Sequence, residues 1–354
     1  MKSNTGSVTV ADVARAAKVS KATAARVLGG YGVASESTRE AVNRAAAQLG
    51  YVGNDLARSM STGRTGLIGV VVGDIENAFF SKAVRGISDT ARAAGLNVII
   101  TNSSEAVEQE REMVGVLLRQ RVAGLIVAPT DSRVVDHLET AIASGTPVVT
   151  LDRDLAALDA DAVYGADYDA ARHVMRRLQD HGHREIAYVT ALTDPVLQGD
   201  NLGGVPISAV RERLRGFVDA SREAGVAQPE QLIFTNAVDE DRIFGIVATL
   251  LKRQPRITAV LASDSIIGAD VFRALASAGI RIPRDLSFVS WFDADWTRIA
   301  SPSVSVVDQP TYRFGARATE CLIERLNGST SAPRKLQIPT NLIERESIGA
   351  APGS

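Results

Sequence analysis

Cysteine is nearly absent from this chain of 354 residues, in which Cys321 is the only one. No intramolecular disulfide can therefore form, which indicates a reducing compartment. No apolar run approaches the ~18 residues of a membrane-spanning helix, and residues 1–10 lack the apolar core of a secretory signal. These absences favour a cytoplasmic protein with no membrane partner.

Histidine and the common catalytic motifs are scarce as well. His137, His173 and the His-Gly-His at 181–183 have no cysteine or carboxylate cluster at metal-ligand spacing. The histidines at 181–183 are expected to be solvated, or to cap a helix, in a turn from helix to strand. The segment after the first predicted strand lacks a phosphate-binding glycine loop, and no G-x-S-x-G elbow occurs. We therefore expect no catalytic residue, no metal, no cofactor and no enzyme. A sugar- or nucleotide-processing α/β enzyme is the weaker alternative.

Charge is unevenly distributed although the whole chain carries a net charge of only −2. Residues 1–60 contain eight Lys and Arg against four Asp and Glu, whereas the remaining 294 contain 31 against 37. A hydrophobic fraction of 45% is sufficient for sizeable cores in that larger part. A basic head on an acidic body predicts a DNA contact confined to the head.

Residues 8–28 predict two short helices joined by a tight turn. Thr9 can cap a first helix that runs to about Ala17, Lys18 and Val19 make the turn, and Ser20 can cap a second helix. Apolar positions at helical spacing would face inward in both. The second helix then presents its first turns outward, where a recognition helix meets base edges. Its outward residues are Lys21, Ala22, Thr23 and Arg26.

A third helix and a linker are predicted to complete the head. The helix is expected over Thr38–Leu49, started by Ser35 or Ser37. Asn54 can cap one further short helix, and the Ser-Thr-Gly at 61–63 would end it in a flexible joint. The clearest domain boundary of the chain is therefore expected here.

The body alternates short β-branched runs with amphipathic stretches. This rhythm predicts parallel βα sheets, and its repetition predicts two lobes with a cleft between them. The expected strands are 67–72, 97–101, 124–129, 147–151, 185–190, 231–235, 258–262 and 286–290. The expected helices lie near 80–94, 107–119, 133–143, 209–224, 240–252 and 266–277.

The head sequence from VTVADVARAAKVSKATAARVL to NDLARSM closely resembles the DNA-binding domain of the lactose-repressor (LacI/GalR) family. Body segments such as IGVVVGDIENAFF, HGHREIAYV, RLRGF and GIRIPRDLSFVS match the family in order, so the resemblance covers nearly all of 8–345. It implies a small all-α helix-turn-helix head and an α/β periplasmic-binding-protein-like body of two doubly wound parallel-sheet lobes. The implied bounds are 1–53 for the head, 54–66 for the hinge helix and linker, 67–163 with about 294–325 for the first lobe, and 164–293 with about 326–345 for the second.

The resemblance assigns DNA contacts to the head. Lys21, Ala22 and Arg26 would read the major groove, whereas solvated surface is the alternative for the two cations. Arg58 and Met60 would enter the minor groove from paired hinge helices, with Met60 where the family has a wedging leucine. An interdomain helix with a buried methionine is the alternative there. The contacts to phosphate or the DNA backbone that the resemblance implies are Thr9, Ser20, Thr23, Ser35, Thr38 and Asn54.

Candidate effector contacts follow the predicted strands. Carboxylates and guanidinium groups around an aromatic platform suit a polyol, because carboxylates accept hydroxyl hydrogens and arginine donates in a fork. Asp152 and Asp293 could instead be caps, Phe80 could be core, and Arg213 could form an ion pair within its lobe. The candidates are Asp74, Phe80, Asp152, Arg153, Arg213, Asp264, Trp291 and Asp293.

Three departures from the family pattern concern the ligand. Asp264-Ser265 replaces the usual Asn-Asp, and Trp291 replaces a glycine, where it could narrow the pocket or stack on a sugar. The segment 192–208 is roughly a dozen residues longer than usual and could form a lid or be disordered. It contains no arginine, whereas the purine-binding branch has one there. A neutral carbohydrate is therefore favoured over a purine or an anion.

Together these features predict a dimeric transcriptional repressor of palindromic operator DNA, controlled by a small-molecule effector. Release of DNA by a sugar is expected, with co-repression and a nucleoside or other metabolite as alternatives. An architectural DNA-binding protein without an effector is the alternative from another class. A dimer is expected rather than a tetramer, because no leucine heptad follows Ile343.

Overall fold

The computed structural model of the protein describes residues 8–29, 32–51, 65–193 and 202–352. The chain divides into two compact units, 1–66 and 67–354, which we call the head and the body. Each is considered by itself below.

The head is a bundle of three helices, α1 (Val10–Ala16), α2 (Lys21–Leu28) and α3 (Glu36–Leu49). Val13, Ala24 and Val42 are fully buried where the three helices meet. Lys18 adopts the left-handed conformation, with a φ of 54°, in the turn between α1 and α2. This arrangement confirms the predicted helix-turn-helix and its small apolar core.

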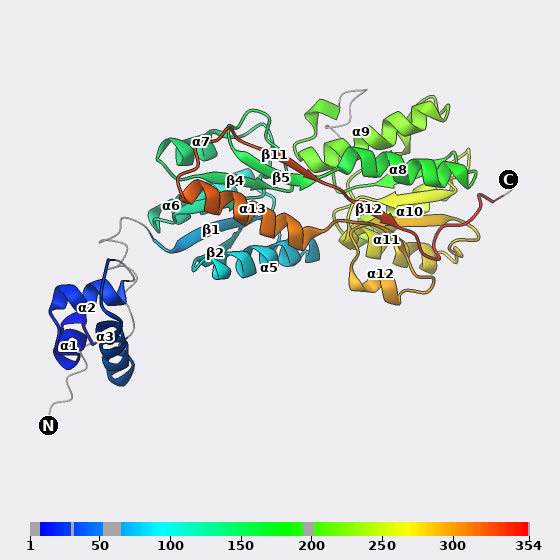
Figure 1. Ribbon diagram of the computed structural model, residues 1–354. Helices are drawn as coiled ribbons and strands as arrows, with labels where there is room; N and C mark the ends of the chain where they lie inside the picture. The colour runs from blue at the N-terminus through cyan, green and yellow to red at the C-terminus, as the bar shows by residue number, and fades with distance from the viewer. Residues whose placement is uncertain (1–7, 30–31, 52–64, 194–201, 353–354) are drawn as a thin grey trace. The chain divides into compact units, whose positions relative to one another are not determined.

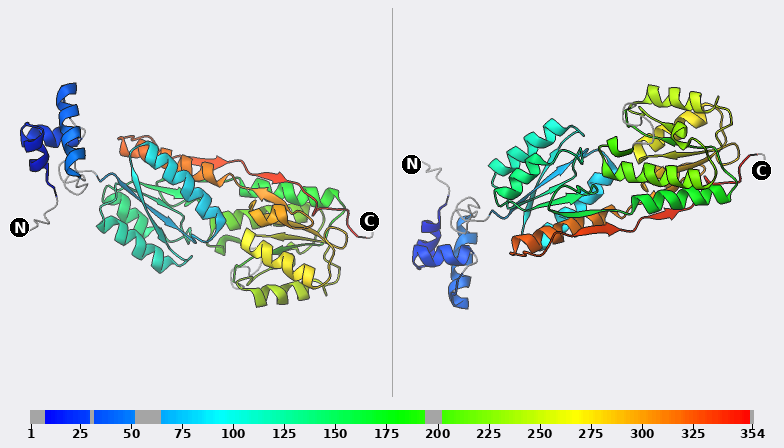
Figure 2. Two further views of the ribbon diagram at one scale, coloured as in Figure 1. Left: turned by 90° about the horizontal axis from the view of Figure 1, so that it is seen from below. Right: turned by 90° about the horizontal axis from the view of Figure 1, so that it is seen from above.

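The first lobe of the body is built on a wholly parallel sheet with the strand order β11-β5-β4-β3-β1-β2. Helices α5 (Ala78–Ala93) and α13 (Thr311–Leu326) cover one face, and α6 (Val107–Arg119) and α7 (Asp136–Ala143) cover the other (Figures 1 and 2). The strands are β1 (Leu67–Val72), β2 (Asn97–Asn102), β3 (Gly124–Val127), β4 (Val148–Leu151), β5 (Asp161–Gly165) and β11 (Lys335–Ile338).

Helices α5 and α13 approach each other closely through two glycines. A Cβ at Gly86 would collide with the carbonyl of Tyr312, and one at Gly315 would collide with the carbonyl of Ala83. Glycine at both positions therefore allows backbone-to-backbone packing, which joins a late segment of the chain to the first helix of the lobe.

The second lobe repeats the plan with the strand order β12-β10-β9-β8-β6-β7, parallel except for the edge strand β12. Its strands are β6 (Ile186–Val189), β7 (Ile233–Phe234), β8 (Ala259–Ala262), β9 (Ser287–Trp291), β10 (Ser305–Asp308) and β12 (Asn341–Ile343). Its helices are α8 (Asp167–Asp180), α9 (Ser208–Glu223), α10 (Glu240–Leu250), α11 (Ser265–Ser277) and α12 (Asp295–Ile299), with short 3-10 turns at Leu202–Gly204 and Pro229–Leu232.

These sheets confirm the predicted fold class, and the chain crosses between the lobes as often as the sequence interpretation expected, but at other residues. Residues 294–325 were assigned to the first lobe, where α13 does pack, but β10 pairs with β9 in the second. Residues 326–345 were assigned to the second lobe, where β12 does pair with β10, but β11 pairs with β5 in the first. The strands β10 and β11 were misplaced because each is only four residues long and nothing in such short runs indicates which sheet they join.

The order of connections determines where a ligand can bind. In the first sheet the chain steps from β1 outward to β2 and then back across to β3, and in the second it steps from β6 to β7 and back to β8. Right-handed crossovers in opposite directions place helices on opposite faces and leave a crevice at the carboxyl ends of β1, β3, β6 and β8.

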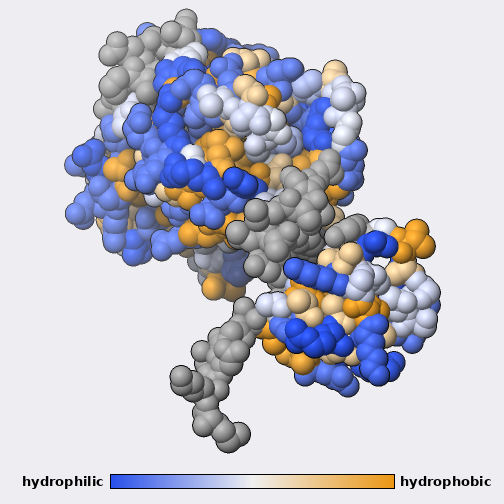
Figure 3. Space-filling model, turned by 90° about the vertical axis from the view of Figure 1, so that its left-hand side faces the viewer, coloured by the Kyte–Doolittle hydropathy of each residue, from blue (hydrophilic) through white to orange (hydrophobic). Residues whose placement is uncertain are grey.

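The surface of the body seen in Figure 3 is mainly hydrophilic, with smaller apolar areas between the polar ones. Among the described residues, no helix is both long and apolar enough to cross a membrane.

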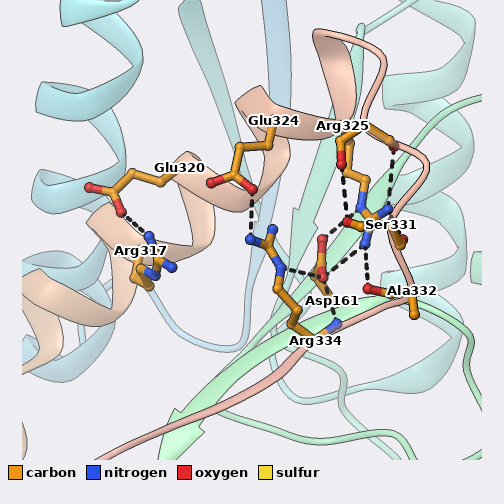
Figure 4. A network of polar contacts seen from close by, with 9 residues as sticks. Asp161, Arg317, Glu320, Glu324, Arg325, Ser331, Ala332 and Arg334 are labelled. Carbon is orange, nitrogen blue, oxygen red and sulfur yellow. Dashed lines mark hydrogen bonds and ion pairs between the residues drawn. The ribbon is translucent and has the colours of Figure 1, made fainter.

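A network of ion pairs binds the end of α13 and the residues that lead into β11 to β5 of the first lobe (Figure 4). The buried carboxylate of Asp161, at the start of β5, accepts a hydrogen bond from Arg325 Nε at 2.8 Å and from the backbone N–H of Arg334 at 2.7 Å. Arg334 also pairs with Glu324 at 2.6 Å, and Arg325 donates to the carbonyl of Ala332. Burial alone would raise the pKa of Asp161, but its arginine partners lower it to about 2.

We predict that Asp161→Asn lowers the free energy of unfolding of the body by about 1–3 kcal/mol at neutral pH, because it leaves two partly buried arginines without their shared carboxylate. Since the folded-state pKa is about 2 and lies below that of an unfolded aspartate, this stabilisation is present above about pH 4 and is lost as the pH falls toward 2. Urea unfolding at several pH values measures both effects. Glu320→Gln, which removes the exposed pair with Arg317, is the control and should cost less than about 0.5 kcal/mol. A loss for Asp161→Asn that is no larger than the control's would contradict the prediction.

Candidate functional site

The head presents one polar face on α2. Lys21, Ala22 and Arg26 are exposed there, and neither cation forms an ion pair with another described residue. The aliphatic part of Arg26 lies against the backbone of Gly32, where a Cβ would come within 2.6 Å of Arg26 Cδ. The position of this arginine is therefore restricted by the turn that follows α2.

Each helix of the head begins at a hydroxyl cap. The backbone N–H of Asp12 donates to Thr9 Oγ1, that of Thr23 to Ser20 Oγ at 3.0 Å, and that of Thr38 to Ser35 Oγ at 3.3 Å. The hydroxyls of Thr23 and Thr38 lie 2.8 Å from those of their caps. All five hydroxyl residues predicted to meet phosphate thus lie at helix N-termini, where backbone N–H groups favour anions. The other predicted DNA contacts, Asn54, Arg58 and Met60, lie outside the described residues.

The body contains a cavity of about 670 Å³ at the carboxyl ends of the strands of both sheets. Asp74 follows β1, Asp152 and Arg153 follow β4, and Asp264 follows β8, so parallel strands deliver these groups to one place. Seven of the eight predicted effector residues line the cavity, namely Asp74, Phe80, Asp152, Arg153, Arg213, Asp264 and Trp291.

On the first-lobe side, Arg153 is held by a bidentate pair with Glu105, at 2.7 Å for each bond, and donates to the carbonyl of Pro129. Its guanidinium lies 5.8 Å from the ring centre of Phe80. Asp152 adopts the left-handed conformation, with a φ of 66°, and its Oδ1 is buried with no hydrogen-bond partner among the described residues. Burial raises the pKa of Asp152 to about 6, although Arg213 and Arg153 oppose the shift.

On the second-lobe side, the buried Arg213 of α9 organises the cavity. It donates through Nε to Asp167 at 2.7 Å and through Nη1 to the carbonyl of Ser263 at 3.1 Å. Its guanidinium also lies 4.9 Å from the ring of Trp291. Arg213 thus forms the ion pair that was the alternative interpretation, and lines the cavity as well.

Asp264 is both a helix cap and a cavity residue. Its Oδ1 accepts hydrogen bonds from the backbone N–H groups of Ile266 and Ile267 at 2.8 and 2.9 Å, which begins α11. Burial raises the pKa of Asp264 despite these bonds. The cavity therefore holds two carboxyl groups whose ionised form is disfavoured, that of the buried Asp152 and that of the half-buried Asp264.

The structure does not bring Asp293 to the cavity lining. Its carboxylate accepts hydrogen bonds from Thr297 at 3.0 Å, Arg345 at 2.7 Å and Arg298. It holds α12 and the C-terminal segment together, so its role is structural, although it does not form the helix cap that was the alternative. The sequence interpretation placed it with the ligand because, like Asp152, it follows a strand.

The expected solvent exposure of the His-Gly-His turn is wrong for His183. This ring is buried and lies 3.0 Å from both Thr258 Oγ1 and the carbonyl of Gly349, because the C-terminal segment folds over it. No group of three potential metal ligands that could hold an ion occurs among the described residues.

Several cavity residues were missed in the sequence. Glu105 orients Arg153, and Asp167, just behind the lining, orients Arg213. Asn77 caps α5, and Gln309 follows β10. Asp167 begins a helix after a strand that was not predicted, so only recognition of β5 could have indicated it.

Several hydrogen bonds join the lobes beside the cavity, two of them from backbone N–H groups. The backbone N–H of Ser132 donates to the carbonyl of Pro206 at 2.8 Å, and the N–H of Asp154 donates to Ser208 Oγ at 2.9 Å. Residues 202–208, the described end of the long 192–208 segment, therefore lie against the first lobe, whereas 194–201 are outside the described residues.

Comparisons with known proteins find relatives of both the head and the body. Residues 9–54 match the model of bacterial regulatory proteins of the lacI family, and 175–348 match a periplasmic binding protein-like domain. The ribose operon repressor of Haemophilus influenzae is 30% identical over 96% of this chain and 98% of its own. The chain belongs to the lacI family. It is therefore a DNA-binding transcriptional regulator and not an enzyme.

Solved structures of lacI-family regulators share the fold. The complex of the transcriptional regulator CelR with cellobiose is 27% identical, has a TM-score of 0.70, and is matched over 96% of this chain and 99% of that one. The lac repressor dimer bound to operator and the anti-inducer ONPF has a TM-score of 0.81 over 98% of this chain and all of that one. At 24% identity, that second likeness shows the fold alone.

We predict that Asp152→Asn raises the free energy of unfolding of this lacI-family protein by about 1–3 kcal/mol near pH 7.5. The folded state raises the pKa of this carboxyl to about 6, so the ionised form costs stability above that pH, and an amide resembles the protonated form. The advantage should fade as the pH falls from about 6 to about 4, where the wild-type carboxyl also becomes protonated.

Chemical denaturation across this pH range measures the difference. Asp159→Asn removes an exposed carboxylate from the same lobe and should change stability by less than about 0.5 kcal/mol at every pH. An Asp152→Asn variant that is less stable than the wild type near pH 7.5 would contradict the prediction.

Proposed function

We propose that the protein is a cytoplasmic repressor that binds palindromic operator DNA as a homodimer, one head on each half-site. Lys21, Ala22 and Arg26 would read base edges from α2, because they are exposed together and carry no competing ion pair with described residues. The capping hydroxyls of Thr9, Ser20, Thr23, Ser35 and Thr38 would meet phosphates together with Asn54. Arg58 and Met60 would enter the minor groove, with Met60 as the wedge.

We further propose that an uncharged carbohydrate in the cavity controls DNA binding. The observation that carries this proposal is the grouping of buried carboxyl groups, paired guanidinium groups and aromatic rings around one space of about 670 Å³. The unpartnered Oδ1 of Asp152 can accept a hydroxyl hydrogen, and Phe80 can face sugar C–H groups. The CelR–cellobiose complex and the ribose operon repressor lend support from the family.

The effector would act by binding two arrangements of the lobes with different affinity, because its contacts come from both. We propose release of DNA on binding, with co-repression as the alternative. An anionic effector such as a sugar acid is disfavoured, because the carboxyl groups of Asp152 and Asp264 already lack full compensation by cations. An architectural protein without an effector would not need a cavity lined in this way.

We predict that Arg26→Ala weakens binding to a duplex selected by the full-length protein from random sequences by about 10- to 100-fold, and relaxes selection at one base pair of each half-site. Fluorescence anisotropy and a repeated selection measure the two effects. Arg44→Ala removes the same charge from exposed α3 and should weaken binding to all duplexes alike. Equal loss of selectivity in the two variants would refute base reading by Arg26.

We predict that at least one neutral sugar in a broad carbohydrate panel raises the midpoint of thermal unfolding of the full-length protein, and that the same sugar lowers its affinity for the selected duplex. Affinity that rises instead would establish co-repression. A sugar that binds without changing DNA affinity would rule out the switch. No response to any carbohydrate would rule out the effector class.

A further inference from the structure

The loop that precedes α9 contacts both lobes of the body. Its residues 202–208, which we call the strap, form a short 3-10 turn (Leu202–Gly204) and lead into the beginning of α9. They are the described end of the segment 192–208, which is longer than the family resemblance implies. The resemblance therefore assigns no role to the strap.

One side of the strap is fixed in the second lobe. Val205 is fully buried in the hydrophobic core of that lobe, and its N–H donates to the carbonyl of Leu202 at 3.1 Å. The carbonyl of Val205 accepts a hydrogen bond from Arg211 Nη1, on α9, at 3.2 Å. We therefore expect the strap to move with the second lobe.

The other side of the strap is bound to the first lobe. The N–H of Ser132, in the segment after β3, donates to the carbonyl of Pro206 at 2.8 Å, and Arg133 Nη1 donates to the carbonyl of Gly204 at 3.3 Å. Arg211 Nη1 also donates to Ser132 Oγ at 3.2 Å. Backbone and side-chain groups of one first-lobe segment thus bind the strap together.

A second segment of the first lobe contributes a further bond. The N–H of Asp154, after β4, donates to Ser208 Oγ at 2.9 Å. Ile207, within the strap, and Arg153, next to Asp154, both line the cavity. The strap therefore joins the lobes at the edge of the space proposed for the effector, where separation of the lobes has to break its contacts.

Arg133 is oriented for its bond to the strap by Asp131. Its backbone N–H and its Nε each donate to Asp131 Oδ1 at 2.9 Å, and its Nη2 donates to Oδ2 at 2.6 Å. The hydrogen bonds from Arg133 lower the pKa of Asp131, so this carboxylate is ionised at neutral pH. Because the guanidinium is held in place before it meets the strap, less side-chain entropy is lost when the contact forms.

We propose that the strap is a conformational lock, which holds the two lobes in the arrangement described here and must be released before that arrangement can change. This inference rests on the proposed two arrangements of the lobes and names the contact that opposes the change between them. Each hydrogen bond contributes little by itself, because the separated groups bond to water instead. The set can therefore favour one arrangement and still be broken when an effector binds the other more tightly.

Hydrogen–deuterium exchange of the full-length protein, resolved to single amides, tests the lock. The amides of Ser132 and Asp154 donate to acceptors on the strap, so they exchange only as fast as the strap is released. Arg133→Ala combined with Arg211→Ala removes two side chains that bind across the lobes and leaves the partner of Asp154, Ser208, intact. We expect the Asp154 amide nevertheless to exchange at least about tenfold faster, because the lobes then separate as units.

The reciprocal variant is Ser208→Ala, which removes the acceptor of Asp154 and leaves the partners of Ser132 in place. A lock that is released as one unit predicts faster exchange at Ser132 as well. If each variant accelerates only the amide next to its own substitution, the contacts are independent and the inference is overturned.

Amides inside each lobe distinguish release of the lock from general loosening. The N–H of Ala128 donates to the carbonyl of Val71 within the first sheet, and that of Ser263 donates to the carbonyl of Val189 within the second, both at 2.9 Å. These two amides should keep the exchange rates of the wild type in every variant. Equal acceleration at these amides and at Asp154 would contradict the lock.

A matched control removes two exposed arginines whose ion pairs stay within one lobe. Arg215→Ala acts on the same helix as Arg211 and removes a pair with Glu212, and Arg317→Ala removes the pair with Glu320 in the first lobe. The combined control should leave the exchange of Ser132 and Asp154 unchanged.

Affinity for the duplex selected by the wild-type protein, measured by fluorescence anisotropy, connects the lock to DNA binding. The Arg133→Ala, Arg211→Ala variant should change this affinity at least about threefold and the control should not, although both lie in the body. Faster exchange with unchanged DNA affinity would overturn the regulatory role of the strap and leave the proposed repressor standing. Failure of the wild-type protein to select any duplex would overturn the proposed function, whereas the exchange rates would still decide whether the strap locks the lobes.

Discussion

The buried guanidinium of Arg213 is the interaction on which the cleft depends. It connects the start of α8 through Asp167, the end of β8 through the carbonyl of Ser263, and the end of β9 through Trp291. A buried cation requires an anion, and Asp167 supplies one at 2.7 Å. The carboxyl group of Asp152 lies near the same guanidinium. However, the two cations beside it are already paired, Arg213 with Asp167 and Arg153 with Glu105. Burial therefore outweighs attraction and raises its pKa. The polar wall of the cavity thus contains a carboxyl group whose negative charge the neighbouring arginines do not fully compensate.

The lobes are joined by a chain that crosses between them repeatedly, and these crossings explain both the success and the failure of the sequence interpretation. Hydrophobic alternation was sufficient to predict eight strands and the two sheets, because each strand has a run of β-branched residues. The later crossings were expected from the family resemblance, but the sheets that β10 and β11 join were not predicted, because such short strands do not indicate their partners. Two features bind α13 and β11 to the first lobe: the close packing of α5 and α13 at glycines, and the ion pairs of Asp161. Neither produces a local sequence pattern that would predict it.

The cavity residues could be predicted where topology alone decides their position. Asp74, Asp152 and Asp264 follow parallel strands, and a parallel sheet carries such residues to one edge. Asp293 follows β9 in the same way, yet its carboxylate turns to Arg298 and Arg345. Local sequence cannot distinguish the two cases, because the decisive partner is 52 residues away. The partner of Arg213 was missed for a related reason, since Asp167 begins a helix behind a strand with no clear pattern.

Trp291 stands where the family resemblance implies a glycine, and its contact with Arg213 gives the larger side chain a physical role. Its ring is fully buried and lies under the guanidinium of Arg213, while its Nε1 has no hydrogen-bond partner among the described residues. An indole at this position fills space at the base of the second-lobe side and restricts the orientation of the arginine. The open volume is then bounded by the aliphatic residues of α9 and α11.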